Sequence, residues 1–149
     1  MTQYTGERPS DTIRFASDRA RKGWDMMLPP TQRLANEMAR WLWIEFGIYL
    51  TLTETHTSKE QDNALQRVST THRDGRAFDV RIRDPLSGDI LLSEDVIAKF
   101  CAHFRKKYPN LGAISKGTPG QRSLIVYKPH GSGPHLHIQI KQGAKRWHA

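Results

Sequence analysis

The chain has 149 residues, of which 37% are hydrophobic, and its 23 lysines and arginines against 15 acidic residues give a net charge of +8. This length suits one domain with a real core, and no apolar run approaches the roughly 20 residues of a membrane span. The single cysteine, Cys101, excludes an internal disulfide and argues against a thiolate metal site. The N-terminus lacks the apolar segment of a signal peptide, so we expect synthesis in a cytoplasm.

The first part of the chain, residues 1–28, is polar and mixed in charge. We expect a short helix here, capped by Asp11 and running through Arg21 to Gly23, or else a loose arm. Residues 29–149 are expected to form the main domain.

A clear helix is predicted after Pro29, with Thr31 as its N-cap and Gly47 at its end. Apolar residues recur there near the helical period, namely Leu34, Met38, Trp41, Leu42 and Phe46. The β-branched and aromatic run 48–53 then predicts a strand, and Ser58 is expected to cap a short exposed helix.

Two later segments, 77–83 and 134–141, alternate between apolar and polar residues as half-buried strands do. Between them we expect a turn at 84–88, a helix capped by Ser93, and short strands within 111–115 and 123–127. The apolar residues of this helix are Val96, Ile97, Phe100, Cys101 and Phe104. The order of elements predicts an α+β domain, a mostly antiparallel sheet with helices packed on one face.

The polar faces of the two alternating segments carry ionisable residues. If the segments share a sheet, Asp79 and His137 can lie on one wet face, and the turn at Gly75 can fold His72 over it. Two imidazoles and one carboxylate form a common catalytic zinc ligand set that leaves one position open. His135 and His137 are two residues apart on the same strand, roughly 7 Å from each other. Spacing alone leaves open whether His135 binds the metal or assists the reaction.

The alternative is an ordinary surface position for each histidine and an ion pair of Asp79 with Arg76 or Arg81. This alternative is less favoured because three histidines and an aspartate occur in two segments that each contain a glycine and that share the same alternation of apolar and polar residues. Spacing alone still leaves both interpretations open.

The segment 70–79, TTHRDGRAFD, resembles the Ser-x-His-x-x-Gly-x-Ala-x-Asp motif of the LAS peptidases, and 134–138, PHLHI, resembles the His-x-His strand of that group. The group comprises D-alanyl-D-alanine peptidases, phage L-alanyl-D-glutamate endolysins, murein endopeptidases and the hedgehog signalling domain. The resemblance covers about residues 48–141. It implies that His72, Asp79 and His137 hold Zn²⁺ on the sheet face opposite the helices, with His135 as the catalytic residue beside the metal-bound water.

Further positions follow from the same resemblance. Thr70 stands where the group has serine and keeps the hydroxyl, and Thr70, Arg76 and His130 are expected to contact substrate. Thr57 stands where an arginine that engages the substrate is expected, and Arg67, Arg73 or Arg76 are the possible replacements.

The sequence therefore predicts a zinc peptidase that cleaves peptidoglycan stem or cross-link peptides, acting on the cell wall after phage release or as part of a virion. One alternative is a metal-binding structural or virion module with little catalysis, which Thr57 favours. Another is a basic nucleic-acid-binding protein, which the charge and the segment 141–146 support but which lacks an aromatic-rich binding motif. We expect a monomer whose positive charge attracts anionic envelope polymers. The bond that is cleaved stays open.

Overall fold

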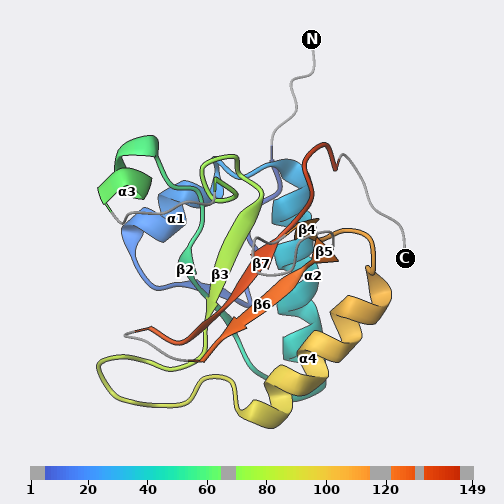
Figure 1. Cartoon of the computed structure of the whole chain (residues 1–149). Coiled ribbons are helices and arrows are strands. Elements are labelled where there is room, and N and C mark those ends of the chain that lie inside the picture. Colours follow the sequence, from blue (N-terminus) through green and yellow to red (C-terminus); the bar gives the residue numbers. More distant parts are fainter. Residues whose placement is uncertain (1–5, 65–69, 115–121, 130–132, 145–149) are drawn as a thin grey trace.

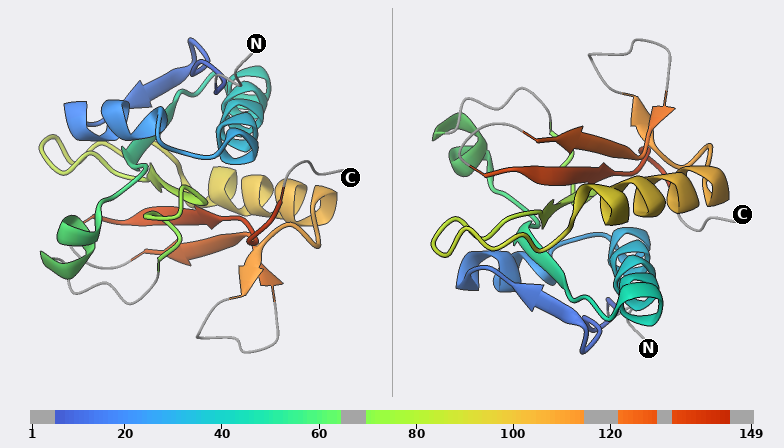
Figure 2. Two further views of the ribbon diagram at one scale, coloured as in Figure 1. Left: turned by 90° about the horizontal axis from the view of Figure 1, so that it is seen from above. Right: turned by 90° about the horizontal axis from the view of Figure 1, so that it is seen from below.

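The protein, seen here in a computed structural model that describes residues 6–64, 70–114, 122–129 and 133–144, is built on a five-stranded sheet (Figure 1). The strands lie in the order β1 (Ile13–Phe15), β2 (Leu50–Glu54), β3 (Ala77–Arg81), β7 (His135–Gln139) and β6 (Ile125–Lys128). β1 is parallel to β2, and every other neighbouring pair is antiparallel. Two further strands, β4 (Ala113–Ile114) and β5 (Arg122–Ser123), form a small second sheet set apart from the first (Figure 2). The expected α+β class with a mostly antiparallel sheet is confirmed.

The helices described are α1 (Asp18–Trp24), α2 (Pro29–Phe46), α3 (Lys59–Ala64) and α4 (Glu94–Lys107). Of the two long helices, α2 passes behind β6 and β7 in Figure 1, and α4 lies beside these strands at the lower right. Their apolar residues share one core with the inward face of the central strands; the fully buried members include Leu34, Met38, Leu42, Phe78, Val80, Phe100, Phe104, Leu136 and Ile138. The alternation predicted for 77–83 and 134–141 therefore assigns the faces correctly.

The N-terminal segment differs from the prediction. Asp11 begins no helix, because the chain turns there and enters β1, where Ile13 is buried beside Leu50. α1 begins only at Asp18, capped by the Ser17 hydroxyl, which accepts a hydrogen bond from the Ala20 amide. β1 adds a strand to the main sheet, so this part of the segment is no loose arm.

Trp24 anchors this segment in the core. Its side chain is fully buried, and its indole Nε1–H donates a 2.7 Å hydrogen bond to the Glu7 carbonyl. A buried indole needs such a partner, because an unpaired N–H away from water is costly.

α2 begins at Pro29, not after Thr31. Proline suits the first helical positions, since its missing N–H needs no cap there, and Leu28 at the N-cap makes no side-chain capping bond. The Thr31 hydroxyl instead donates a 2.8 Å hydrogen bond to the Gly75 carbonyl. The expected end at Gly47 is confirmed, with a left-handed φ of 65°.

Most of the remaining predictions are confirmed. Ser93 caps α4 through the Val96 amide, all five of its expected apolar residues are buried, and Ser58 caps α3 through the Gln61 amide. The strand expected at 123–127 is instead divided, because β5 and β6 belong to different sheets and the buried Leu124 separates them.

Candidate metal centre

Two neighbouring strands bring Asp79 and His137 together. β3 and β7 pair with Asp79 directly opposite His137, and directly paired residues project to the same face of a sheet. Phe78, Val80, Leu136 and Ile138 occupy the other face, in the core. The expected sharing of one face by Asp79 and His137 is thus confirmed.

His72 reaches the same place from the loop before β3. The loop folds tightly: the Asp74 amide donates to the Thr70 carbonyl at 2.8 Å, and the Gly75 amide donates to the His72 carbonyl at 3.0 Å. Gly75 has a φ of 72°, and a Cβ on it would lie 3.0 Å from backbone atoms of Met26 and Leu28. Glycine is therefore required both for the backbone conformation and for the close approach of the chain leading into α2.

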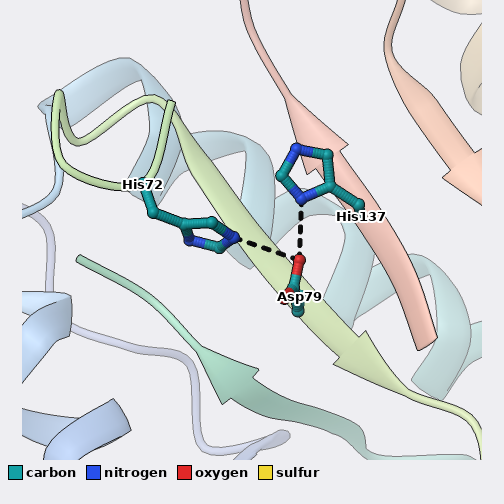
Figure 3. A group of neighbouring side chains, drawn as sticks. All are labelled: His72, Asp79 and His137. Atoms are coloured by element: carbon teal, nitrogen blue, oxygen red, sulfur yellow. Dashed lines mark hydrogen bonds and ion pairs between the residues drawn. The ribbon is translucent and has the colours of Figure 1, made fainter. Parts of the chain in front are cut away.

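The three side chains converge on one carboxylate oxygen (Figure 3). His137 Nδ1 lies 2.8 Å and His72 Nε2 3.2 Å from Asp79 Oδ1. All three residues are buried, with exposed fractions of 5 to 8%. One ligand atom from each lies within 4.8 Å of the other two, so this group could hold a metal ion. We call these three residues the metal group.

Each histidine also forms a hydrogen bond through the ring nitrogen that points away from Asp79. This outer hydrogen bond determines the tautomer, and so whether the nitrogen that faces Asp79 carries a lone pair in the neutral ring. His72 Nδ1 lies 2.6 Å from the Thr55 carbonyl oxygen. A carbonyl oxygen can only accept, so His72 Nδ1 carries the hydrogen and Nε2 carries the lone pair in the neutral ring.

His137 is oriented in the same way from the other side. Its Nε2 lies 3.1 Å from Gln139 Oε1, while the Gln139 amide nitrogen donates to the Ser123 carbonyl at 3.0 Å. The Ser123 carbonyl thereby fixes the amide orientation, so His137 Nε2 donates and Nδ1 holds the lone pair. Thr71 Oγ1 lies 3.5 Å from the same Nε2.

The electrostatics of Asp79 follow from this arrangement. Burial raises the pKa of the Asp79 carboxyl, but His72 and His137, when protonated, lower it more through their charges and hydrogen bonds, so that its net pKa lies well below the ordinary value. Asp79 is therefore ionised at neutral pH. Two imidazole lone pairs that face an ionised carboxylate repel it unless a proton or a metal cation lies between them.

His135 lies next to the metal group but outside it. Its side chain is 25% exposed, and its Nε2 is 3.7 Å from Asp79 Oδ2. Its Nδ1 is 2.7 Å from the Gly133 carbonyl oxygen, so Nδ1 donates and Nε2 is the proton acceptor in the neutral ring.

Two of the residues expected at the substrate, Thr70 and Arg76, have hydrogen-bond partners outside the metal group. The Thr70 hydroxyl donates to Asp74 Oδ2 at 2.9 Å. The Arg76 guanidinium donates to the Ile140 carbonyl at 2.9 Å and to Asp74 Oδ2 at 3.1 Å, which ties it to the loop and to the strand end. His130 and Arg67 lie outside the described residues.

Thr57 has a structural role where an arginine was expected. It is fully buried, and its hydroxyl donates a 2.6 Å hydrogen bond to Asp62 Oδ1. Asp62 is itself buried, and Arg73 Nε lies 3.9 Å from its other carboxylate oxygen. Glu54, at the end of β2, forms an ion pair with Arg19.

The sequence interpretation missed two of the groups that orient the histidines. Gln139 could have been found, because it lies on the same strand face as His135 and His137. The Thr55 contact could not have been found, because every residue has a backbone carbonyl and the residue type does not show which one binds a histidine.

Comparisons of the chain with protein-family models, with curated proteins and with solved structures found no match. Among the described residues, no helix is both long and apolar enough to cross a membrane.

Proposed function

We propose that the chain is a zinc-dependent peptidase of the LAS type that cleaves peptidoglycan stem or cross-link peptides. The observation that carries this proposal is the convergence of His72 Nε2 and His137 Nδ1 on Asp79 Oδ1 in a buried position. Each lone pair is aimed by an outer hydrogen bond, as is usual for metal-ligating histidines. The motif resemblance supplies the reaction class.

The donor set fits zinc, which takes imidazole nitrogen and carboxylate oxygen ligands and keeps a fourth position for water at catalytic sites. His72 Nε2, Asp79 Oδ1 and His137 Nδ1 would hold it. Bound there, zinc supplies a hydroxide-like nucleophile at neutral pH and polarises the scissile carbonyl.

His135 is the residue that we assign to proton transfer. Its Nδ1–H is held by the Gly133 carbonyl, which leaves Nε2 as an acceptor on the side of Asp79. Its partial exposure lets substrate reach this nitrogen, whereas the metal group is buried. An imidazole in such a position can take a proton from the attacking water and return it to the leaving amine.

The experiment that tests the proposal combines metal analysis with substrate digestion. Protein purified without a metal-affinity tag should contain one zinc per chain and should release peptides from purified sacculi, identified by mass spectrometry. His137→Ala should lose both properties, because a two-ligand site binds metal far more weakly. His103→Ala is the matched control, since His103 stacks on Trp41 at 4.9 Å in the helix layer. Unchanged zinc content in His72→Ala and His137→Ala would contradict the assignment.

A second candidate function is a metal-binding structural or virion module with little catalysis. The buried Thr57–Asp62 hydrogen bond favours it, because this position carries no cation for the substrate carbonyl. Stoichiometric zinc without peptide release from any sacculus preparation would support this candidate over the peptidase.

The route to the cell wall belongs to the same proposal. The enzyme would reach peptidoglycan after phage-mediated release or as part of a virion, and its net charge of +8 would favour association with anionic envelope polymers.

A further inference from the structure

Two cationic residues flank His135 on the sheet face that carries the metal group. His135 of β7 is paired with Arg81 of β3 on one side and with Lys128 of β6 on the other. Directly paired residues of antiparallel strands share a face, with Cβ atoms about 4.5–5.5 Å apart. The face therefore carries Asp79 and His137 in one row and Arg81, His135 and Lys128 in the next. We call Arg81 and Lys128 the basic pair.

The basic pair is not neutralised within the described part of the chain. The ion pairs found there include neither Arg81 nor Lys128. Asp79, in the neighbouring row, contacts His72, His135 and His137. The pKa of the exposed Asp84 is lowered mainly by hydrogen bonds from the Leu86 and Ser87 amides and least by Arg81. Arg81 and Lys128 lie on the strands to either side of β7, each about 4.8 Å away, so an anion bound over His135 would lie between the two side chains.

The two cations differ in ways that suit one anionic group. Arg81 is half-buried at the end of β3, where a planar guanidinium can bind a carboxylate with two parallel hydrogen bonds. Lys128 is exposed at the end of the edge strand β6, where its flexible stem can adjust to the same group.

We propose that Arg81 and Lys128 bind a carboxylate of the substrate, so that the preferred substrates are acidic peptides with a carboxylate about one residue from the bond cleaved. This inference rests on the proposed peptidase function. Residues i and i+2 of a strand lie roughly 7 Å apart, which is the step from the Asp79 row to the basic pair. One extended residue spans about 3.5 Å, and the long side chains of Arg81 and Lys128 cover the difference.

The test uses two pairs of peptides that differ by one charge. The first is diacetyl-L-Lys-D-Ala-D-Ala as the free acid and as its C-terminal amide; the second is acetyl-L-Ala-D-Glu with its α-carboxylate free or amidated. The Kd of each is measured calorimetrically on the full chain, and kcat and KM are measured where turnover occurs. We expect the wild type to prefer the acid of at least one pair by about 10- to 100-fold, the range of a hydrogen bond to a charged group.

The variant Arg81→Gln/Lys128→Gln should lose this preference through Kd and KM, while its zinc content stays unchanged. The control Arg40→Gln/Lys106→Gln removes the same charge from exposed positions on α2 and α4 and should keep the preference. A wild type that binds acid and amide equally, or binds neither, overturns the inference, as does a preference that survives in the basic-pair variant.

Failure of this inference can be told from failure of the peptidase proposal. A zinc-containing wild type that digests sacculi without acid preference overturns the carboxylate site and leaves the peptidase standing. Acid preference in Kd without zinc or hydrolysis contradicts the peptidase and leaves the basic pair as a carboxylate site.

Discussion

His135 and His137 lie two residues apart on one strand face, but their contacts differ. His137 Nδ1 is within 2.8 Å of Asp79, whereas His135 Nε2 is 3.7 Å away and its side chain is partly exposed. We predict that His135→Ala keeps near-stoichiometric zinc and that its rate falls by roughly 100-fold or more, the scale for losing a positioned acid–base group. Metal analysis and turnover of the same samples check this. Zinc loss equal to that of His137→Ala would make His135 a ligand.

Gln139 acts on the metal group through His137. Its Oε1 accepts the hydrogen bond that aims the His137 lone pair at Asp79. Gln139→Leu removes this acceptor at nearly constant volume, and we predict a 10- to 100-fold weaker zinc affinity, the usual cost of losing an outer hydrogen bond to a ligand. Competition with a chromogenic chelator measures the affinity. Gln139→Glu keeps the acceptor for His137 but loses the donor to the Ser123 carbonyl, so it should lose less zinc affinity than Gln139→Leu. Equal loss in both variants would point to packing instead.

The loop 70–76 shows at the scale of an element how the backbone places a ligand. Gly75 holds a φ of 72° against the backbone of Met26 and Leu28. Gly75→Ala should lower the free energy of unfolding by about 1–2 kcal/mol or more, because a left-handed alanine is strained and its Cβ has no room, and it should weaken zinc binding through His72. Chemical denaturation and metal titration check both effects.

Gly88→Ala is the control for this loop. Gly88 has a similar φ of 78° but no atom within 4 Å of the added Cβ. It should cost stability through the same strain and leave zinc affinity unchanged, because Gly88 lies in the turn after β3. Equal zinc affinity in both variants would show that the close approach at Gly75 does not position His72.

The helices and the sheet do not depend on the metal group for their core. α2 and α4 bury their apolar residues on the sheet face opposite Asp79 and His137. We therefore predict that a chelator abolishes activity and leaves the far-ultraviolet circular dichroism largely unchanged. A collapse of that signal on chelation would instead give the metal a structural role, as in domains that fold only with zinc bound.

At the scale of the whole molecule, one core joins the first strand to the last. Ile13 and Trp24 belong to the same buried cluster as Cys101 of α4 and Ile138 of β7. Burial raises the pKa of the Cys101 thiol, so little reactive thiolate is present in the folded state. We predict that alkylation of Cys101 is slow in native protein and follows the same denaturant midpoint as tryptophan fluorescence. Labelling that precedes the fluorescence change would show that α4 opens separately.

The sequence by itself determined the features that are written within a few neighbouring residues. The Ser93 cap and the apolar spacing of 96–104 identify α4, because capping and helical periodicity act within one or two turns. Strict alternation around Asp79 and His137 separates the core face from the polar face, because successive strand residues point to opposite sides. The members of the metal group were predicted from the resemblance of the motifs, because these patterns alone left open both the metal site and the role of His135.

Only the tertiary structure decided what depends on pairing between distant segments. β1 has only three residues and is a strand because it pairs with residues Leu50 to Leu52 of β2. The local sequence carries no sign of that distant pairing, and its spacing therefore predicted a helix. The Thr31 hydroxyl donates its hydrogen bond to the Gly75 carbonyl and does not cap its own helix. Pro29 and Pro30 at the start of α2 leave no need for a side-chain cap there. The lone pairs of the metal group are aimed partly by the backbone carbonyl of Thr55, and a carbonyl has no residue type to read. The basic pair likewise exists only in the register of three strands, since Arg81 and Lys128 are 47 positions apart in the sequence and meet beside His135 only when β3, β7 and β6 are aligned.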